Sequence, residues 1–123
     1  MTINIVVTGM GKERIAELAR SAGGDRIEAT IRTDFEAALA VKDGGADFYI
    51  GACQSGAGGA LGVANAILGS AKVVRMASVS RGEEEQAIEA ALGEGKTAFG
   101  LSRAQVDTVV PPLVKAMVAA RQA

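Results

Sequence analysis

The feature that most constrains the fold is a regular alternation of short apolar runs and longer helix-like segments, repeated five times along the chain. The expected strands are residues 3–7, 27–31, 47–51, 72–77 and 96–100. The expected helices are residues 12–22, 34–43, 60–68, 81–93 and 103 to the C-terminal end. Strands and helices that alternate in this way favour a parallel sheet with helices on both faces.

The predicted fold class is therefore α/β, with one domain over residues 1–123 and a five-stranded, doubly wound parallel sheet of the Rossmann or flavodoxin-like kind. The expected strand order is 2-1-3-4-5, which places strands one and three side by side at the switch point of the sheet. Ligands of such proteins bind outside the carboxyl ends of the strands at that point. We expect any binding site to lie there.

Capping patterns predict where three of the helices begin. In each pattern a Ser or Thr is followed three residues later by Glu or Gln, so that the two side chains can cap the first turn. The pairs are Thr33 with Glu36, Ser80 with Glu83, and Ser102 with Gln105. In the last helix, Pro111 and Pro112 are expected to break or kink the chain near Val110.

Composition excludes several classes of function. The net charge is −1, which gives no indication of a nucleic-acid surface, and no apolar run reaches the ~18 residues of a membrane span. The chain has no His and one Cys, which argues against Cys–His and Ser–His pairs, a zinc site and an intrachain disulfide. Arg14 stands where a dinucleotide fingerprint starting at Gly9 needs its third glycine. We expect a cytoplasmic protein with no metal and no cofactor.

A glycine-rich turn after the third strand is the strongest candidate site. Free backbone N–H groups at the start of the following helix, together with the helix dipole, suit a phosphate or a carboxylate. The candidate ligand-binding residues in this turn are Gln54, Ser55, Gly56, Ala57, Gly58 and Gly59. Cys53 precedes them and is the candidate catalytic residue, acting as a base or a nucleophile. The alternative is that Cys53 is a small buried residue and that the glycines only form a tight turn.

A second glycine turn follows the first strand and faces the same switch point. Its candidate ligand-binding residues are Gly9, Met10, Gly11 and Lys12. Lys12 at the start of a helix opposes the helix dipole, which an anionic ligand would explain, although a solvated lysine is also common. Asp34 and Glu36, which follow the second strand, can reach the mouth of the same crevice, and Asp34 is equally suited to capping a helix.

The third helix, Gly59–Leu68, has Asn65 as its one polar side chain. A helix that is apolar on all sides must be covered on all sides. We expect a second copy of the chain to cover it, which predicts a homo-oligomer. The alternative is that the two terminal helices wrap it within one chain.

Two stretches of the sequence resemble a family of glycine-rich bacterial proteins of unknown function, the YhfU-type family. They are residues 47–58 (DFYIGACQSGAG) and residues 96–102 (KTAFGLS). The resemblance extends over nearly the whole chain but implies no activity. Members resemble components found near genes for sugar or amino-acid handling and for membrane proteins, which implies a role in small-molecule uptake or metabolism.

The Cys53 turn also resembles that of sugar-phosphate isomerases of the ribose-5-phosphate isomerase B type. The matching residues are Cys53 to Gly58, with Ala64 and Asn65 further along the helix. The resemblance implies that Cys53 is the base, that Ser55 contacts the substrate and that Gly56 to Gly59 donate to the developing oxyanion. The Asp-His motif that these enzymes carry after their first strand is missing from this chain.

Four functions are consistent with these observations. The first is a binding protein for a small anionic metabolite, phosphorylated or carboxylated, that serves a transporter or an enzyme partner. The alternative is an isomerase-like enzyme that uses Cys53 as its base. Further alternatives are a relative of the phosphotransferase B subunits, whose phosphorylated Cys follows the first strand rather than the third, and a protein-interaction module.

Overall fold

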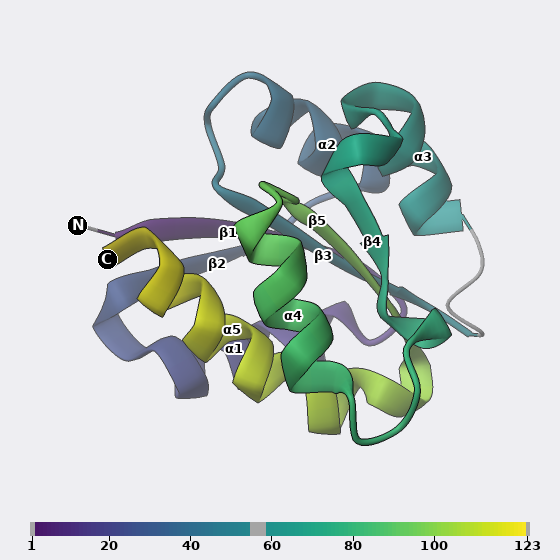
Figure 1. The fold of residues 1–123 in the computed structure, drawn as a ribbon. Helices are drawn as coiled ribbons and strands as arrows, with labels where there is room; N and C mark the ends of the chain where they lie inside the picture. Colours follow the sequence, from purple (N-terminus) through teal and green to yellow (C-terminus); the bar gives the residue numbers. More distant parts are fainter. Residues whose placement is uncertain (1, 55–58, 123) are drawn as a thin grey trace.

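The computed structural model describes residues 2–54 and 59–122, and in that part of the chain five strands alternate with five α-helices. The strands are β1 (Ile3–Gly9), β2 (Ile27–Ile31), β3 (Phe48–Cys53), β4 (Val73–Arg75) and β5 (Ala98–Ser102). The α-helices are α1 (Lys12–Gly23), α2 (Asp34–Lys42), α3 (Gly59–Leu68), α4 (Glu84–Gly93) and α5 (Val106–Gln122). The strands pair in parallel and helices cover both faces of the sheet (Figure 1), which confirms the predicted fold class.

The strand order is β2-β1-β3-β5-β4. β1 and β3 are neighbours as predicted, but the last two strands exchange the places that the order 2-1-3-4-5 gave them. β4 has only three residues, none of them fully buried, which suits the edge of a sheet, whereas β5 is buried along most of its length. A side chain at Gly100 of β5 would also meet Leu61 of α3, its Cβ lying 2.7 Å from Leu61 Cδ2. Gly100 therefore lets α3 pack directly on β5.

The helices form two layers with separate apolar cores. α1, α4 and α5 cover one face of the sheet, and α2 and α3 cover the other (Figure 1). Successive residues of β1 point to opposite faces, so Ile5 and Val7 belong to the first core and Val6 to the second. The first and last helices therefore lie on the face opposite α3, and the alternative in which they wrap α3 is wrong.

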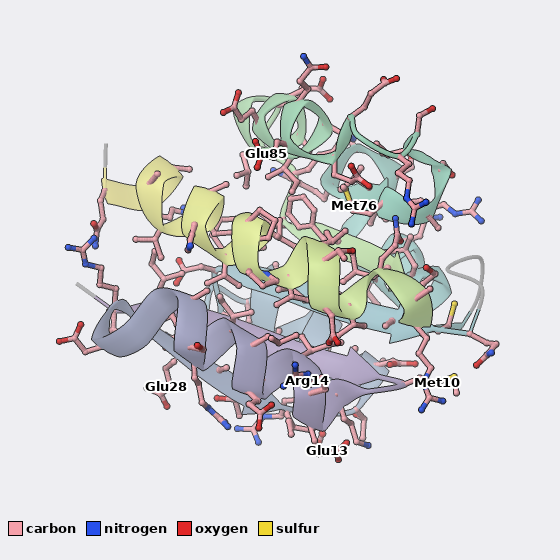
Figure 2. The ribbon with its side chains drawn as sticks, turned by 90° about the horizontal axis from the view of Figure 1, so that it is seen from below. Met10, Glu13, Arg14, Glu28, Met76 and Glu85 are labelled. Atoms are coloured by element: carbon pink, nitrogen blue, oxygen red, sulfur yellow. The ribbon has the colours of Figure 1, made fainter. Side chains whose placement is uncertain are left out.

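On the first face, α1 and α5 lie side by side (Figure 2). Arg14 of α1 connects them at the surface, where its Nε donates to Asp107 Oδ1 of α5 at 3.0 Å. The same guanidinium pairs with Glu17 one turn along α1. All three side chains are largely exposed, so we assign Arg14 a surface role rather than a role in the site.

Two of the three predicted capping boxes are present. The Glu36 N–H donates to Thr33 Oγ1 and the Thr33 N–H donates to Glu36 Oε1, both at 3.2 Å. At the start of the last helical segment, the Ser102 N–H donates to Gln105 Oε1 at 3.0 Å. The two residues of each pair are three positions apart, so the pattern for both boxes can be read from the sequence.

The third predicted box, Ser80 with Glu83, is wrong. α4 begins at Glu84, and Glu83 precedes it without a side-chain cap. The backbone of the same four residues forms a turn in which the Glu83 N–H donates to the Ser80 carbonyl at 3.0 Å. Gly82 has a φ of 92° in this turn, a left-handed conformation that only glycine adopts readily. The glycine thus favours a turn where the capping pattern predicted a helix.

α5 continues through Pro111 and Pro112, so the break in the helix predicted near Val110 is wrong. A proline leaves the carbonyl four residues earlier without its helical partner. Those carbonyls belong to Asp107 and Thr108, which are both exposed, and water can satisfy them. Within the described residues, no helix has the length and the apolar character needed to cross a membrane.

Candidate functional site

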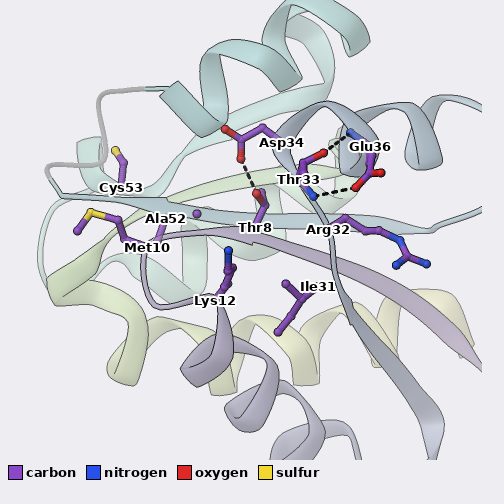
Figure 3. A pocket seen from close by; sticks show the side chains of 11 residues that line it. Thr8, Met10, Lys12, Ile31, Arg32, Thr33, Asp34, Glu36, Ala52 and Cys53 are labelled. Carbon is purple, nitrogen blue, oxygen red and sulfur yellow. Dashed lines mark hydrogen bonds between the residues drawn. The ribbon is translucent and has the colours of Figure 1, made fainter.

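A crevice of about 630 Å³ opens at the carboxyl ends of β1, β2 and β3, at the switch point of the sheet (Figure 3). α1 approaches it from one face of the sheet and α2 from the other. Its lining residues are Thr8, Gly9, Met10, Lys12, Ile31, Arg32, Thr33, Asp34, Glu36, Ala52 and Cys53. Sheets of this topology bind their ligands at this position.

The turn after β1 is held against β3 by a direct backbone contact. The Met10 N–H donates to the carbonyl of Ala52 at 2.9 Å. Gly9 has a φ of 90°, and a Cβ built on it would overlap the Ala52 carbonyl oxygen. Only glycine fits this position, because both the backbone conformation and the space exclude a side chain.

Lys12 contributes a cation to the crevice from the first residue of α1. The helix is preceded by Gly11, which has no side chain with which to cap it. The N–H groups of the first turn of a helix have no partner within the helix, and they carry the positive end of its dipole. Lys12 and the uncapped start of α1 therefore make this side of the crevice favourable for an anion. Gly11 itself is not among the lining residues.

A polar pair lies on the opposite side of the crevice, at the start of α2. Thr8 is 2% exposed, and in the described part of the chain only Tyr49 is another fully buried residue whose side chain carries a polar group. Its hydroxyl donates to the carboxylate of Asp34, the first residue of α2 (Figure 3). Burial raises the pKa of Tyr49, with a further contribution from the charge of Asp34, so its hydroxyl stays protonated at neutral pH.

The outer edge of the crevice carries Arg32, Thr33 and Glu36. The carboxylate of Glu36 accepts a hydrogen bond from the backbone of Thr33 in the capping box, which lowers the pKa of Glu36. Because Thr33 is the cap of α2, the carboxylate of Asp34 is left to interact with Thr8 rather than with the helix backbone. Of the two roles that the sequence allowed for Asp34, the structure supports the one at the crevice.

Cys53 is the last residue of β3, so the strand extends two residues beyond the predicted end. It is half-buried, pairs with Ser102 of β5 and lines the crevice. The turn predicted to bind the anion lies mostly outside the described residues: Ser55, Gly56, Ala57 and Gly58 belong to the part that the structure does not describe. Gln54 is exposed and is not among the lining residues, and Gly59 begins α3.

The structure thus brings Gly9, Met10 and Lys12 together with Cys53, from two turns more than forty residues apart in the sequence. It also adds Thr8, whose only sequence signal is its position at the end of an apolar strand. Within residues 2–54 and 59–122, no group of three or more His, Cys, Asp or Glu side chains is arranged to hold a metal ion.

The fold and the crevice define a doubly wound α/β protein with a candidate ligand site at its switch point. The chain belongs to the family described as "Protein of unknown function DUF2620", which matches residues 3–117. Proteins described as uncharacterized protein YhfU, from Escherichia coli strain K12 and from Shigella flexneri, are each 38% identical over 110 residues. The match covers 89% of this chain and 94% of each relative, and it confirms the resemblance to the YhfU-type family.

Solved structures with a similar fold include two type B ribose 5-phosphate isomerases. The enzyme from Trypanosoma brucei matches with a TM-score of 0.69 and 19% identity, covering 95% of this chain and 86% of that one. The enzyme from Trypanosoma cruzi matches with a TM-score of 0.69 and 14% identity, covering 95% and 84%. At these identities the likeness is one of fold, and it agrees with the resemblance noted in the sequence.

The close contact between Gly9 and Ala52 predicts that the structure cannot accommodate a side chain at residue 9. Gly9→Ala should lower the free energy of unfolding by about 3 kcal/mol or more, because the new Cβ meets a backbone atom as well as adopting a strained φ. Gly11→Ala is the matched control, because it has a φ of 73° but nothing within 4 Å of the added Cβ. It should cost only about 1–2 kcal/mol. Urea unfolding measures the free energy of unfolding of both variants. Equal losses of stability in the two would contradict the steric role of Gly9.

Proposed function

We propose that the crevice binds a small phosphorylated or carboxylated metabolite. The observation that carries this proposal is the meeting of Lys12, the uncapped start of α1 and the end of β3 at the switch point of the sheet. Each feature alone is common in proteins. Their convergence on one crevice gives an anion a positive side chain and free backbone donors in the place where this topology binds ligands.

The size of the crevice supports a small ligand. Its volume of about 630 Å³ lies within the range of roughly 300–1,000 Å³ that is usual for small-molecule sites. In the family setting that the sequence suggested, such a protein would hold a sugar or amino-acid derivative in the cytoplasm for a transporter or an enzyme partner. No cofactor, nucleic acid or metal ion enters this proposal.

Removing the positive charge of Lys12 should weaken anion binding. We expect Lys12→Gln to raise the Kd for inorganic phosphate or a sugar phosphate about tenfold, as is typical of a lost hydrogen bond to a charged group. Lys42→Gln is the control, because Lys42 is an exposed lysine at the end of α2 and is not among the lining residues. Titration calorimetry gives the affinities, and a thermal-shift panel of phosphate, sulfate, sugar phosphates, and hydroxy- and amino-acids selects the ligand. A flat panel at millimolar ligand would overturn the proposal.

A second candidate function is sugar-phosphate isomerisation, which the position of Cys53 in the crevice and the shared fold favour. In this reaction the thiolate of Cys53 would remove the proton from C2 of an aldose and return it to C1, while the carbonyl oxygen gains a proton at one carbon and the hydroxyl loses one at the other. The chain has no His to open a sugar ring, so the open-chain sugar would have to bind. The phosphotransferase B subunits carry their cysteine after the first strand, whereas Cys53 lies on the third. We therefore rank the phosphotransferase alternative below isomerisation.

The variant Cys53→Ser separates binding from catalysis. If the protein only binds its ligand, the substitution should change the Kd less than about threefold, and the wild-type protein should show no turnover of ribose 5-phosphate. If Cys53 is the base, the substitution should lower turnover by about 10²–10⁴-fold and leave binding intact, as is typical of the loss of a general base. Interconversion of ribose 5-phosphate and ribulose 5-phosphate, followed by absorbance, is the measurement.

We also propose that a second copy of the chain covers α3. In the single chain, Gly62, Asn65 and Ala66 of this otherwise apolar helix are exposed. Small residues such as Gly62 and Ala66 allow a second backbone to approach closely. The terminal helices cannot supply that cover, because α1 and α5 lie on the other face of the sheet.

Light scattering after size-exclusion chromatography should therefore give the mass of a dimer or a larger closed assembly. Ala66→Arg should convert it to a monomer, because a long charged side chain would be placed in the centre of the interface. Ala90→Arg is the matched control, since Ala90 is an exposed alanine of α4 on the opposite face, and it should keep the wild-type mass. A monomeric wild-type protein would overturn this proposal and leave α3 as a surface for a transporter or enzyme partner.

A further inference from the structure

The crevice that we propose as an anion site is lined by the carboxylate of Asp34, a group that repels anions. Asp34 is half-buried and lines the same cavity as Lys12. An uncompensated carboxylate repels a bound phosphate or carboxylate, and the repulsion grows as water is excluded. Its presence therefore needs a reason beyond anion binding.

The structure holds this carboxylate in a fixed position. Thr8 is buried at the end of β1, and its hydroxyl donates to Asp34. The buried Tyr49 lies near enough for the charge of Asp34 to raise the pKa of its hydroxyl. Thr8 of β1 and Asp34 of α2 thus meet at one side of the crevice. A carboxylate held by a rigid strand loses little conformational freedom when it accepts a ligand.

The carboxylate of Asp34 can accept hydrogen bonds in addition to the one from Thr8. An ionised carboxylate has about four acceptor positions, and the hydroxyl of Thr8 occupies one of them. The helix does not require the others, because Thr33 and Glu36 cap α2. Among the described residues, acceptor positions therefore remain for a donor group in the crevice, and Figure 3 shows Asp34 among the side chains around it.

Lys12 and Asp34 give the crevice opposite charges on its two sides. Lys12 belongs to α1 on one face of the sheet, and Asp34 belongs to α2 on the other, with the end of β1 between them. A ligand that spans the crevice would place its anion beside Lys12 and a hydrogen-bond donor beside Asp34. In dinucleotide-binding sheets of similar topology, an acidic side chain after the second strand likewise accepts from a ribose hydroxyl.

We propose that Asp34 is a specificity-determining residue, which selects anions that carry a hydroxyl group by accepting a hydrogen bond from it. This inference rests on the proposed function and names the class of ligand as a hydroxylated phosphate or carboxylate. Thr8 is the positioning residue that holds Asp34. A plain anion of the same size is disfavoured because it leaves the carboxylate without a compensating donor.

Matched pairs of ligands test this selectivity in the full-length protein. Glycerol 3-phosphate is compared with propyl phosphate, and lactate with propionate, by titration calorimetry. In the wild-type protein the hydroxylated member of the pair that binds should have a Kd at least about tenfold lower, as expected for a hydrogen bond to a charged acceptor. Equal affinities within a pair would overturn the inference and leave the proposed anion site intact. Alanine joins the second pair, and tighter binding of alanine than of lactate would also overturn the inference, since it would indicate selection for an ammonium group.

Asp34→Asn removes the charge but keeps an oxygen that can accept from Thr8. It should reduce the preference within each pair to about threefold or less, both by weakening the hydroxylated ligand and by strengthening the plain anion. A purely structural Asp34 would change the two affinities by the same factor, which would overturn the inference. Thr8→Val should reduce the preference in the same direction, because Asp34 loses the hydroxyl that holds it.

Glu36→Gln is the matched control. It removes one negative charge from the same helix and the same crevice, and glutamine still completes a capping box. The preference for the hydroxylated ligand should be unchanged in this variant. Loss of preference in Glu36→Gln as well would show that net charge rather than Asp34 selects the ligand.

A neutral polyol separates failure of the inference from failure of the proposed function. Ribitol carries hydroxyl groups and no anion, so its binding does not depend on Lys12. If no anion binds, the proposed function is overturned. The binding of ribitol then tests, independently of anion binding, whether Asp34 accepts a hydrogen bond from a hydroxyl group. Thermal stabilisation of the wild-type protein by ribitol, absent in Asp34→Asn, would support a hydroxyl site, and no stabilisation in either protein would overturn it.

Discussion

The parallel pairing of β1 with both β2 and β3 determines where every side chain of the crevice lies. β1 pairs with β2 from Ile3 to Val7 and with β3 from Ile5 to Gly9, so the carboxyl ends of all three strands meet at one edge of the sheet. The connections from β1 and β2 then lead to helices on opposite faces. The crevice lies between those helices, because no backbone connection fills the space where they diverge.

The tightest point of this arrangement is the contact between the turn after β1 and the end of β3. The hydrogen bond from Met10 to Ala52 continues the pairing of the two strands beyond the last residue of β1. It requires a residue without a side chain at Gly9. The same turn leads directly into α1 and so sets the position of Lys12. A backbone constraint in one residue thus helps to place Lys12 at the crevice.

The polar groups of the crevice illustrate how a parallel sheet can carry charge at its end. The buried residues Ile5 to Val7 of β1 are apolar, and Thr8, which follows them, donates to the first residue of α2. There a carboxylate is favoured by the dipole of α2 and by the hydroxyl of Thr8, and it remains within reach of the cavity. On the other face, α1 begins without a side-chain cap and with a lysine. The two helix starts therefore differ in charge, although both lie at the same edge of the sheet.

Features set by neighbouring residues were determined by the sequence alone: the alternation of strands and helices, the bounds of β2, and the capping box of Thr33 and Glu36. These depend on spacings of a few residues, which local physics fixes. The order of β4 and β5, the continuity of α5 through Pro111 and the pairing of Thr8 with Asp34 were decided only by the tertiary structure. Thr8 and Asp34 are 26 residues apart, and Gly100 receives Leu61 from a helix on another part of the chain. Such contacts depend on which elements become neighbours after the sheet has formed, and no local pattern records that outcome.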